Sequence, residues 1–96
     1  MSDTPADRSA KQFTIVNMLG LHARAATKLV QLASKFPCDV ELVRDDHVVN
    51  AKSVMGVLLL CGACGTTIEV RATGERAPEC VDAIGELIAN KFGESS

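Results

Sequence analysis

Apolar residues recur along this chain in two rhythms, and the changes of rhythm divide it into seven elements. Segments in which apolar and polar residues alternate predict strands with one buried face. Segments in which apolar residues recur every three or four positions predict helices with an apolar stripe. Strands are predicted over residues 12–17, 38–44, 48–51 and 66–72, and helices over residues 23–36, 53–60 and 78–92.

Turn-forming residues support these boundaries. Pro37 ends the first long helix, and Asp45 and Asp46 turn the second and third strands into a hairpin. Gly93 stands just past the end of the last helix. Because every element offers one apolar face, the pattern predicts an α+β fold: a four-stranded antiparallel sheet covered on one face by two long helices and one short helix, in an open-faced two-layer sandwich.

The domain organisation is simple. Residues 1–11 mix charge with Ser, Thr and Pro and show no periodicity, so we expect a flexible N-terminal tail. Residues 12–94 are expected to form one domain. A chain of 96 residues builds a single core, which excludes a two-domain enzyme.

Charge and composition limit the classes of partner that we expect this chain to bind. Ten Lys and Arg against twelve Asp and Glu give a net charge of −2, and the chain has no Trp, no Tyr and three Phe. Nucleic acid is therefore not an expected partner, because binding it takes a basic surface or stacking aromatic residues. The longest apolar run, residues 54–61, is shorter than the roughly 20 residues of a membrane span, and the N-terminus lacks a secretion signal. We expect a cytoplasmic protein without membrane insertion, in which the four cysteines are free thiols or metal ligands.

The strongest chemical signal is His22, directly before the first long helix. No Ser, Thr, Asp or Asn lies between Met18 and Ala26 to cap that helix, so the backbone N–H groups of Ala23 and Arg24 are free to bind an anion. The Arg24 side chain adds a planar donor for phosphate oxygens. The helix dipole disfavours imidazolium and so favours a neutral, nucleophilic His22. The alternative is an exposed histidine whose ring caps the helix, with Arg24 merely solvated.

Three segments carry a resemblance to a known family. The segments TIVNMLGLHAR at 14–24, KSVMGV at 52–57 and GTTIEV at 65–70 resemble the phosphocarrier protein HPr of the phosphoenolpyruvate-dependent phosphotransferase system. The resemblance covers residues 12–94. It implies an open-faced sandwich and a carrier that accepts a phosphoryl group from enzyme I and passes it to a IIA-type acceptor. Such a carrier is a substrate of enzyme I and not itself an enzyme, and no cofactor is expected.

The resemblance also implies residue roles. His22 matches the phosphorylated histidine, Arg24 the arginine beside it, and Ser53 a serine that a separate kinase phosphorylates in some members. Ala25 stands where most members have Pro, a difference that should preserve the helix and the site because Pro there only presets the backbone. We connect this variant with the nitrogen-related NPr branch. A monomer is expected.

The short helix is predicted to carry a docking surface. It holds more apolar residues than one buried face can hide. The resemblance to HPr further implies that the family's partners dock there. The alternative is that the segment is deeply buried. Basic side chains are expected to form a rim for an acidic partner. The expected docking residues are Leu21, Lys28, Lys52, Val54, Met55 and Leu58, with Arg24 also in the rim.

Two other functions remain as hypotheses. Cys61 and Cys64 form a CxxC pair that suits a small thiol-based metal carrier. The pair closes a helix instead of opening one, and no second pair is spaced to complete a zinc site, so we expect no metal and treat both cysteines as small, semi-buried apolar residues. A regulatory adaptor without phosphotransfer would be favoured only if His22 were absent.

Overall fold

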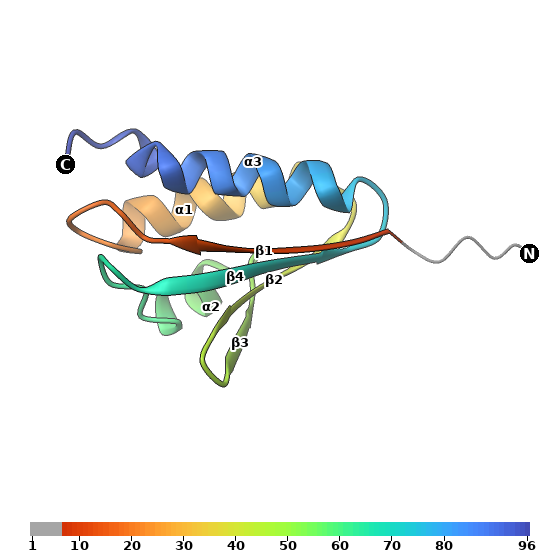
Figure 1. Ribbon diagram of the computed structural model, residues 1–96, viewed down its shortest axis with the longest axis horizontal. Coiled ribbons are helices and arrows are strands. Elements are labelled where there is room, and N and C mark those ends of the chain that lie inside the picture. The colour runs from red at the N-terminus through yellow and green to blue at the C-terminus, as the bar shows by residue number, and fades with distance from the viewer. Residues whose placement is uncertain (1–6) are drawn as a thin grey trace, which may run out of the picture.

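The computed structural model describes residues 7–96, and its order of elements is the one predicted. The strands are β1 (Arg8–Thr14), β2 (Asp39–Arg44), β3 (His47–Asn50) and β4 (Thr67–Thr73). The helices are α1 (Ala23–Ala33), α2 (Val54–Leu59) and α3 (Ala77–Ala89), followed by the short 3₁₀ turn η1 (Lys91–Gly93). Figure 1 shows α1 and α3 running side by side along the sheet. The predicted α+β sandwich is confirmed.

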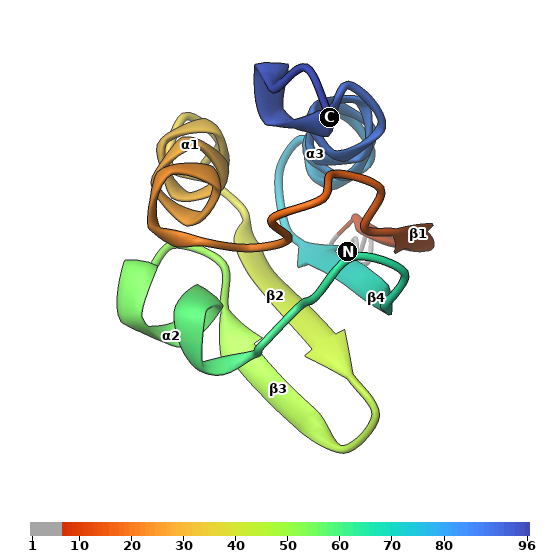
Figure 2. The same ribbon diagram turned by 90° about the vertical axis from the view of Figure 1, so that its left-hand side faces the viewer.

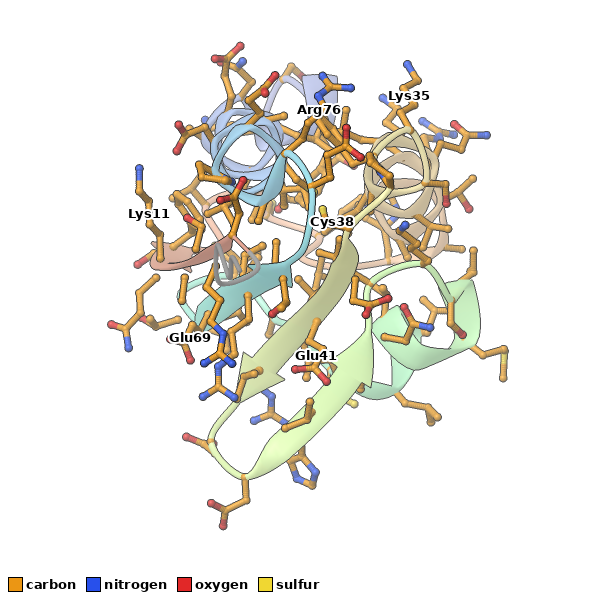
Figure 3. All side chains as sticks on the ribbon, turned by 90° about the vertical axis from the view of Figure 1, so that its right-hand side faces the viewer. Lys11, Lys35, Cys38, Glu41, Glu69 and Arg76 are labelled. Carbon is orange, nitrogen blue, oxygen red and sulfur yellow. The ribbon has the colours of Figure 1, made fainter. Side chains whose placement is uncertain are left out.

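The sheet is antiparallel throughout, in the order β1-β4-β2-β3. All three helices lie on the same side of it (Figure 2), and the other face is left open. Glu41 of β2 and Glu69 of β4 lie on that open side in Figure 3. The alternation along β2 and β4 therefore sends apolar side chains to the helices and polar ones to solvent.

The core fills the space between the helices and the sheet. Leu29 of α1, Leu42 of β2, Ile68 of β4 and Ile84 of α3 are all fully or almost fully buried. Each such side chain contributes roughly 1.5–3 kcal/mol through removal from water. Burial, with Cys38 as the next cause, raises the pKa of the Cys80 thiol to about 12, so Cys80 is an unreactive packing group.

The first strand begins earlier than the sequence indicates. We expected a tail through residue 11, but β1 starts at Arg8, which pairs with Thr73 of β4. The physical reason is that main-chain hydrogen bonds along β4 hold this strand although its side chains, apart from Phe13, show little apolar alternation. The tail prediction is wrong for residues 8–11, and residues 1–6 lie outside the described residues.

The end of α3 differs from the prediction in a way that shapes the site. The last helix was expected to reach Phe92, but it ends at Ala89. Lys91, Phe92 and Gly93 then adopt φ values of 57°, 54° and 81°, in the left-handed region. Phe92 is buried there, and the chain turns back so that the residues after it reach the start of α1. Within residues 7–96, no helix is both long enough and apolar enough to cross a bilayer.

Candidate functional site

His22 lies at the N-cap of α1, with φ −76° and ψ 177°. Its ring makes no capping hydrogen bond, so the alternative of a capping histidine is wrong. The first helical bond runs from the Ala26 N–H to the His22 carbonyl, at 2.8 Å. Among the residues that the structure describes, no acceptor faces the N–H groups of Ala23, Arg24 and Ala25. The predicted open helix terminus is therefore present.

The backbone before His22 is fixed by a close contact that requires glycine. Gly20 has a φ of 65°, and a Cβ atom placed on it would lie 2.5 Å from the Gly62 carbonyl oxygen. The neighbouring Leu21 N–H donates to that same oxygen at 2.8 Å. This contact joins the loop that carries His22 to the loop that follows α2.

Glu94 bonds to the imidazole, although no motif or periodicity in the sequence indicates this contact. The His22 Nε2 atom is hydrogen-bonded to the Glu94 Oε2 atom, and Asn17 donates from Nδ2 to Glu94 Oε1 at 3.0 Å. These contacts with His22 and Asn17 lower the pKa of the Glu94 carboxyl below its usual range. The hydrogen bonds that the Glu94 carboxylate accepts from His22 and Asn17 therefore contribute their full stability above the ordinary carboxyl pKa. That contribution is lost as the pH falls through the lowered pKa of Glu94.

Two hollows flank the His22 ring. The larger, of about 580 Å³, is lined by Met18, Leu19, His22, Ala23, Arg24, Glu94, Ser95 and Ser96. The smaller, of about 280 Å³, is lined by Leu19, Leu21, His22, Cys61, Gly62 and Ala63. The Arg24 side chain is exposed, and no carboxylate in residues 7–96 pairs with it. A basic group and open N–H donors therefore meet beside the histidine.

The predicted docking residues divide into two groups. Met55 is 67% exposed, and Val54 and Leu58 are half-buried, so α2 does present apolar surface. Leu59, Met18 and Leu19 are about as exposed as Met55 and extend that surface, although none of them was named as a docking residue. We call Met18, Leu19, Val54, Met55, Leu58 and Leu59 the apolar surface.

The prediction that Leu21 is a docking residue is wrong, and the two lysines predicted to dock have additional contacts within the protein. Leu21 is buried because its side chain packs against Gly62. Lys28 donates from Nζ to the Phe92 carbonyl at 2.6 Å, and Lys52 donates to the Phe36 carbonyl at 2.7 Å. Both ammonium groups thus hold main-chain segments in place, and their part in docking stays a prediction.

Ser53 begins α2 as the sequence predicts. Its hydroxyl accepts a hydrogen bond from the Gly56 N–H at 3.1 Å, which satisfies one of the free donors at the helix start. The side chain is half-buried, so the hydroxyl is structural and partly accessible.

Cys61 and Cys64 directly follow α2, as expected, but both are exposed, so the prediction of semi-buried residues is wrong. Cys61 has a φ of 57°, and this turn carries the pair out of the core. No three or more His, Cys, Asp or Glu side chains among residues 7–96 are grouped to hold a metal ion.

Comparisons with known proteins place this chain in a family. Residues 9–90 match the family described as PTS HPr component phosphorylation site. Over 81 residues the chain is 48% identical to phosphocarrier protein HPr of Cupriavidus necator, covering 84% of this chain and 91% of that one. It is 45% identical over 86 residues to phosphocarrier protein NPr of Shewanella violacea, covering 90% and 94%. The structure of HPr-C-His from Thermoanaerobacter tengcongensis superposes with a TM-score of 0.88 at 39% identity, covering 92% and 99%.

An open-faced sandwich with a histidine at a bare helix N-terminus, together with these relatives, defines a phosphocarrier of the phosphotransferase system. More particularly, the chain belongs to the HPr family, which includes its NPr relatives.

Proposed function

We propose that this protein accepts a phosphoryl group on His22 from phosphoenolpyruvate by way of enzyme I and passes it to a IIA-type acceptor. The observation that carries the proposal is the N-terminus of α1, where His22, N–H groups without an acceptor among residues 7–96, and the Arg24 side chain line one surface. The protein is a substrate of enzyme I and does not turn over by itself. We expect it to act as a monomer.

The start of α1 is a favourable place for negative charge. A phosphoryl group on the ring would lie next to the positive end of α1 and to the N–H groups of Ala23 and Arg24. The guanidinium of Arg24 offers two parallel donors to its oxygens. These groups stabilise both the transferring phosphoryl group and the phosphorylated carrier without ordering new structure.

Docking is proposed at the apolar surface. Helix α2 packs against α1, and the loop after α2 lines the hollow at His22, so the apolar surface is continuous with the site. Exposed apolar residues next to a reactive group suit a transient partner, and Arg24 supplies a nearby positive charge for an acidic one. Enzyme I and the IIA-type acceptor would use this same surface in turn.

The test is incubation of the protein with labelled phosphoenolpyruvate, enzyme I and Mg²⁺. We expect one phosphoryl group per chain, in a linkage that is acid-labile and alkali-stable, as phosphohistidine is. Addition of a sugar-type or a nitrogen-type IIA protein should discharge the label, and the faster acceptor assigns the branch. We expect the nitrogen-type acceptor to be faster. Absence of label with active enzyme I would refute the proposal.

Arg24→Ala should slow phosphorylation of His22 about tenfold without preventing it. The reason is the loss of an exposed charge-assisted contact to phosphate, for which about 1.4 kcal/mol is a fair magnitude. Initial rates with enzyme I measure the effect. Arg71→Ala, which removes the same group from the open face of β4, should leave the rate unchanged. Equal rates for wild type and Arg24→Ala would remove Arg24 from the site.

Cys61→Ser combined with Cys64→Ser should leave phosphorylation within about twofold of wild type. Cys61 only lines the smaller hollow, and serine replaces its sulfur with a group of similar size. Purified under reducing conditions, the wild-type protein should hold no stoichiometric zinc by elemental analysis. One zinc ion per chain that is lost in the double variant would instead support the thiol-based metal carrier.

A further inference from the structure

We infer that Glu94 is a positioning residue for phosphotransfer: it holds the proton on His22 Nε2, directs the phosphoryl group to Nδ1, and balances the charge of the phosphorylated ring. The inference rests on the proposed function and assigns a role to a residue outside the matched segment at 9–90. Glu94 acts through His22 and does not itself contact the reacting phosphorus.

The carboxylate is held where this role requires it. Glu94 Oε2 bonds to His22 Nε2, and Glu94 Oε1 accepts from Asn17 Nδ2 at 3.0 Å. Asn17 is fully buried, and its Nδ2 atom also donates to the Gly20 carbonyl at 2.9 Å. The glutamate is thus attached to the same loop that positions the histidine, and its side chain is only 14% exposed.

The chain after α3 is built to deliver this group. The left-handed residues Lys91, Phe92 and Gly93 reverse the chain, and the buried Phe92 ring anchors the turn. Lys28 of α1 donates to the Phe92 carbonyl at 2.6 Å, and the Met18 N–H donates to the Ser96 carbonyl at 3.1 Å. Two non-glycine residues in this region of φ are costly, so the surrounding packing must favour the turn.

The chemistry follows from the hydrogen bond. An ionised carboxylate only accepts, so His22 must donate from Nε2, and the neutral ring then keeps its lone pair on Nδ1. In transfer from a phosphohistidine donor, the Nδ1 lone pair forms the bond to phosphorus. The donor P–N bond breaks, and its electron pair returns to the donor nitrogen. The proton stays on Nε2, so the phosphorylated ring is cationic, and Glu94 neutralises it.

Onward transfer reverses these changes. The acceptor attacks phosphorus, the Nδ1–P bond breaks, and its electron pair returns to a neutral ring that still carries its Nε2 proton. A cationic ring is a better leaving group than one that has lost this proton. By keeping the proton in place, Glu94 maintains the reactive form as the pH rises.

Other charged and titratable groups near His22 do not offer this contact. Arg24 and Lys28 of α1 are basic side chains, so they oppose a cationic ring. The Cys61 thiol lies on the other side, in the smaller hollow, and Ser96 lines the larger one. Among the side chains of residues 7–96, only Glu94 forms an ion pair with His22.

The experiment compares the full-length wild type with Glu94→Gln and Glu94→Ala. Glu86→Gln, an identical change at an exposed position of α3, is the matched control. Each protein is phosphorylated with enzyme I and, separately, with potassium phosphoramidate, which needs no protein partner. Ring ¹⁵N NMR identifies the protonated and the phosphorylated nitrogen. The rates of hydrolysis and of transfer to a IIA protein are followed from pH 5 to pH 9.

Glu94→Gln keeps an oxygen that accepts from Nε2 but removes the charge. We expect an unchanged tautomer and KM, a kcat for onward transfer about tenfold lower above neutral pH, and a deficit that disappears in acid, where solvent protonates the ring. Glu94→Ala should show the same loss and a new population protonated on Nδ1. The control should match wild type.

Wild-type pH profiles and ring shifts in both Glu94 variants would overturn the inference. Faster transfer at every pH would overturn it too, since Glu94 would then be a clamp that blocks the ring. If enzyme I fails to label wild type, the proposed function itself fails, and labelling by phosphoramidate still shows which nitrogen is nucleophilic.

Discussion

His22→Ala should receive no phosphoryl group from phosphoenolpyruvate and enzyme I, while the protein stays folded. The loss is complete because the substitution removes the imidazole that accepts the phosphoryl group. Stability should change little, since the side chain is 27% exposed and its one hydrogen bond is to Glu94, which Asn17 continues to hold. Labelling with radioactive phosphoenolpyruvate measures the first expectation, and circular dichroism with thermal unfolding measures the second.

The other histidine is the matched control for this experiment. His47 is exposed at the start of β3, where it pairs with Arg44 of β2. His47→Ala should be labelled like wild type. Full labelling of His22→Ala, or loss of label in His47→Ala, would show that the acceptor has been assigned to the wrong residue.

The fold was predictable because its signals are local. Alternation along β2 and β4 and the apolar stripes of α1 and α3 each follow from a few adjacent residues, and one apolar face per element permits few packings. The start of β1 was missed for the complementary reason. Residues 8–11 are held by main-chain bonds to β4, which leave no mark on side-chain pattern.

The residues of the site also divide into those with a local sequence signal and those without one. His22, Arg24 and the missing cap are visible because they are neighbours in sequence. Glu94 is 72 residues from His22 and reaches it only through a turn of left-handed residues at positions 91–93, two of which are not glycine. Neither hydrophobic periodicity nor glycine placement predicts such a turn.

Exposure was harder to predict than secondary structure. Met18, Leu19 and Leu21 are similar in type and close in sequence, yet the first two are exposed and the third is buried. The difference arises where the loop crosses Gly62, because Leu21 packs against that glycine while its neighbours face solvent. A loop without periodicity carries no local signal that shows which of its side chains will be buried.

Ser53→Asp should receive phosphate from enzyme I about 10²-fold more slowly than wild type while retaining its fold. Aspartate is itself a good N-cap, so it can replace the serine oxygen that accepts from the Gly56 N–H, and its charge suits a helix start. Ser53→Ala, which lacks an acceptor, should lose about 1 kcal/mol of stability and keep its transfer rate. The two variants thereby separate the capping role from the effect of charge.

Because Ser53→Asp keeps its fold, its slower phosphorylation must arise from the changed charge at the docking surface. Ser53 directly precedes Val54 and Met55 of the apolar surface, and a negative charge there opposes an acidic or apolar partner. A phosphate on Ser53, added by a separate kinase, would act in the same way with more charge. Stopped-flow rates at low and high salt test this, with Gln12→Glu on the open face as a control of equal charge. The deficit should be larger at low salt, where repulsion is less screened. If Ser53→Asp and Gln12→Glu transfer alike at low ionic strength, Ser53 is a helix cap and nothing more.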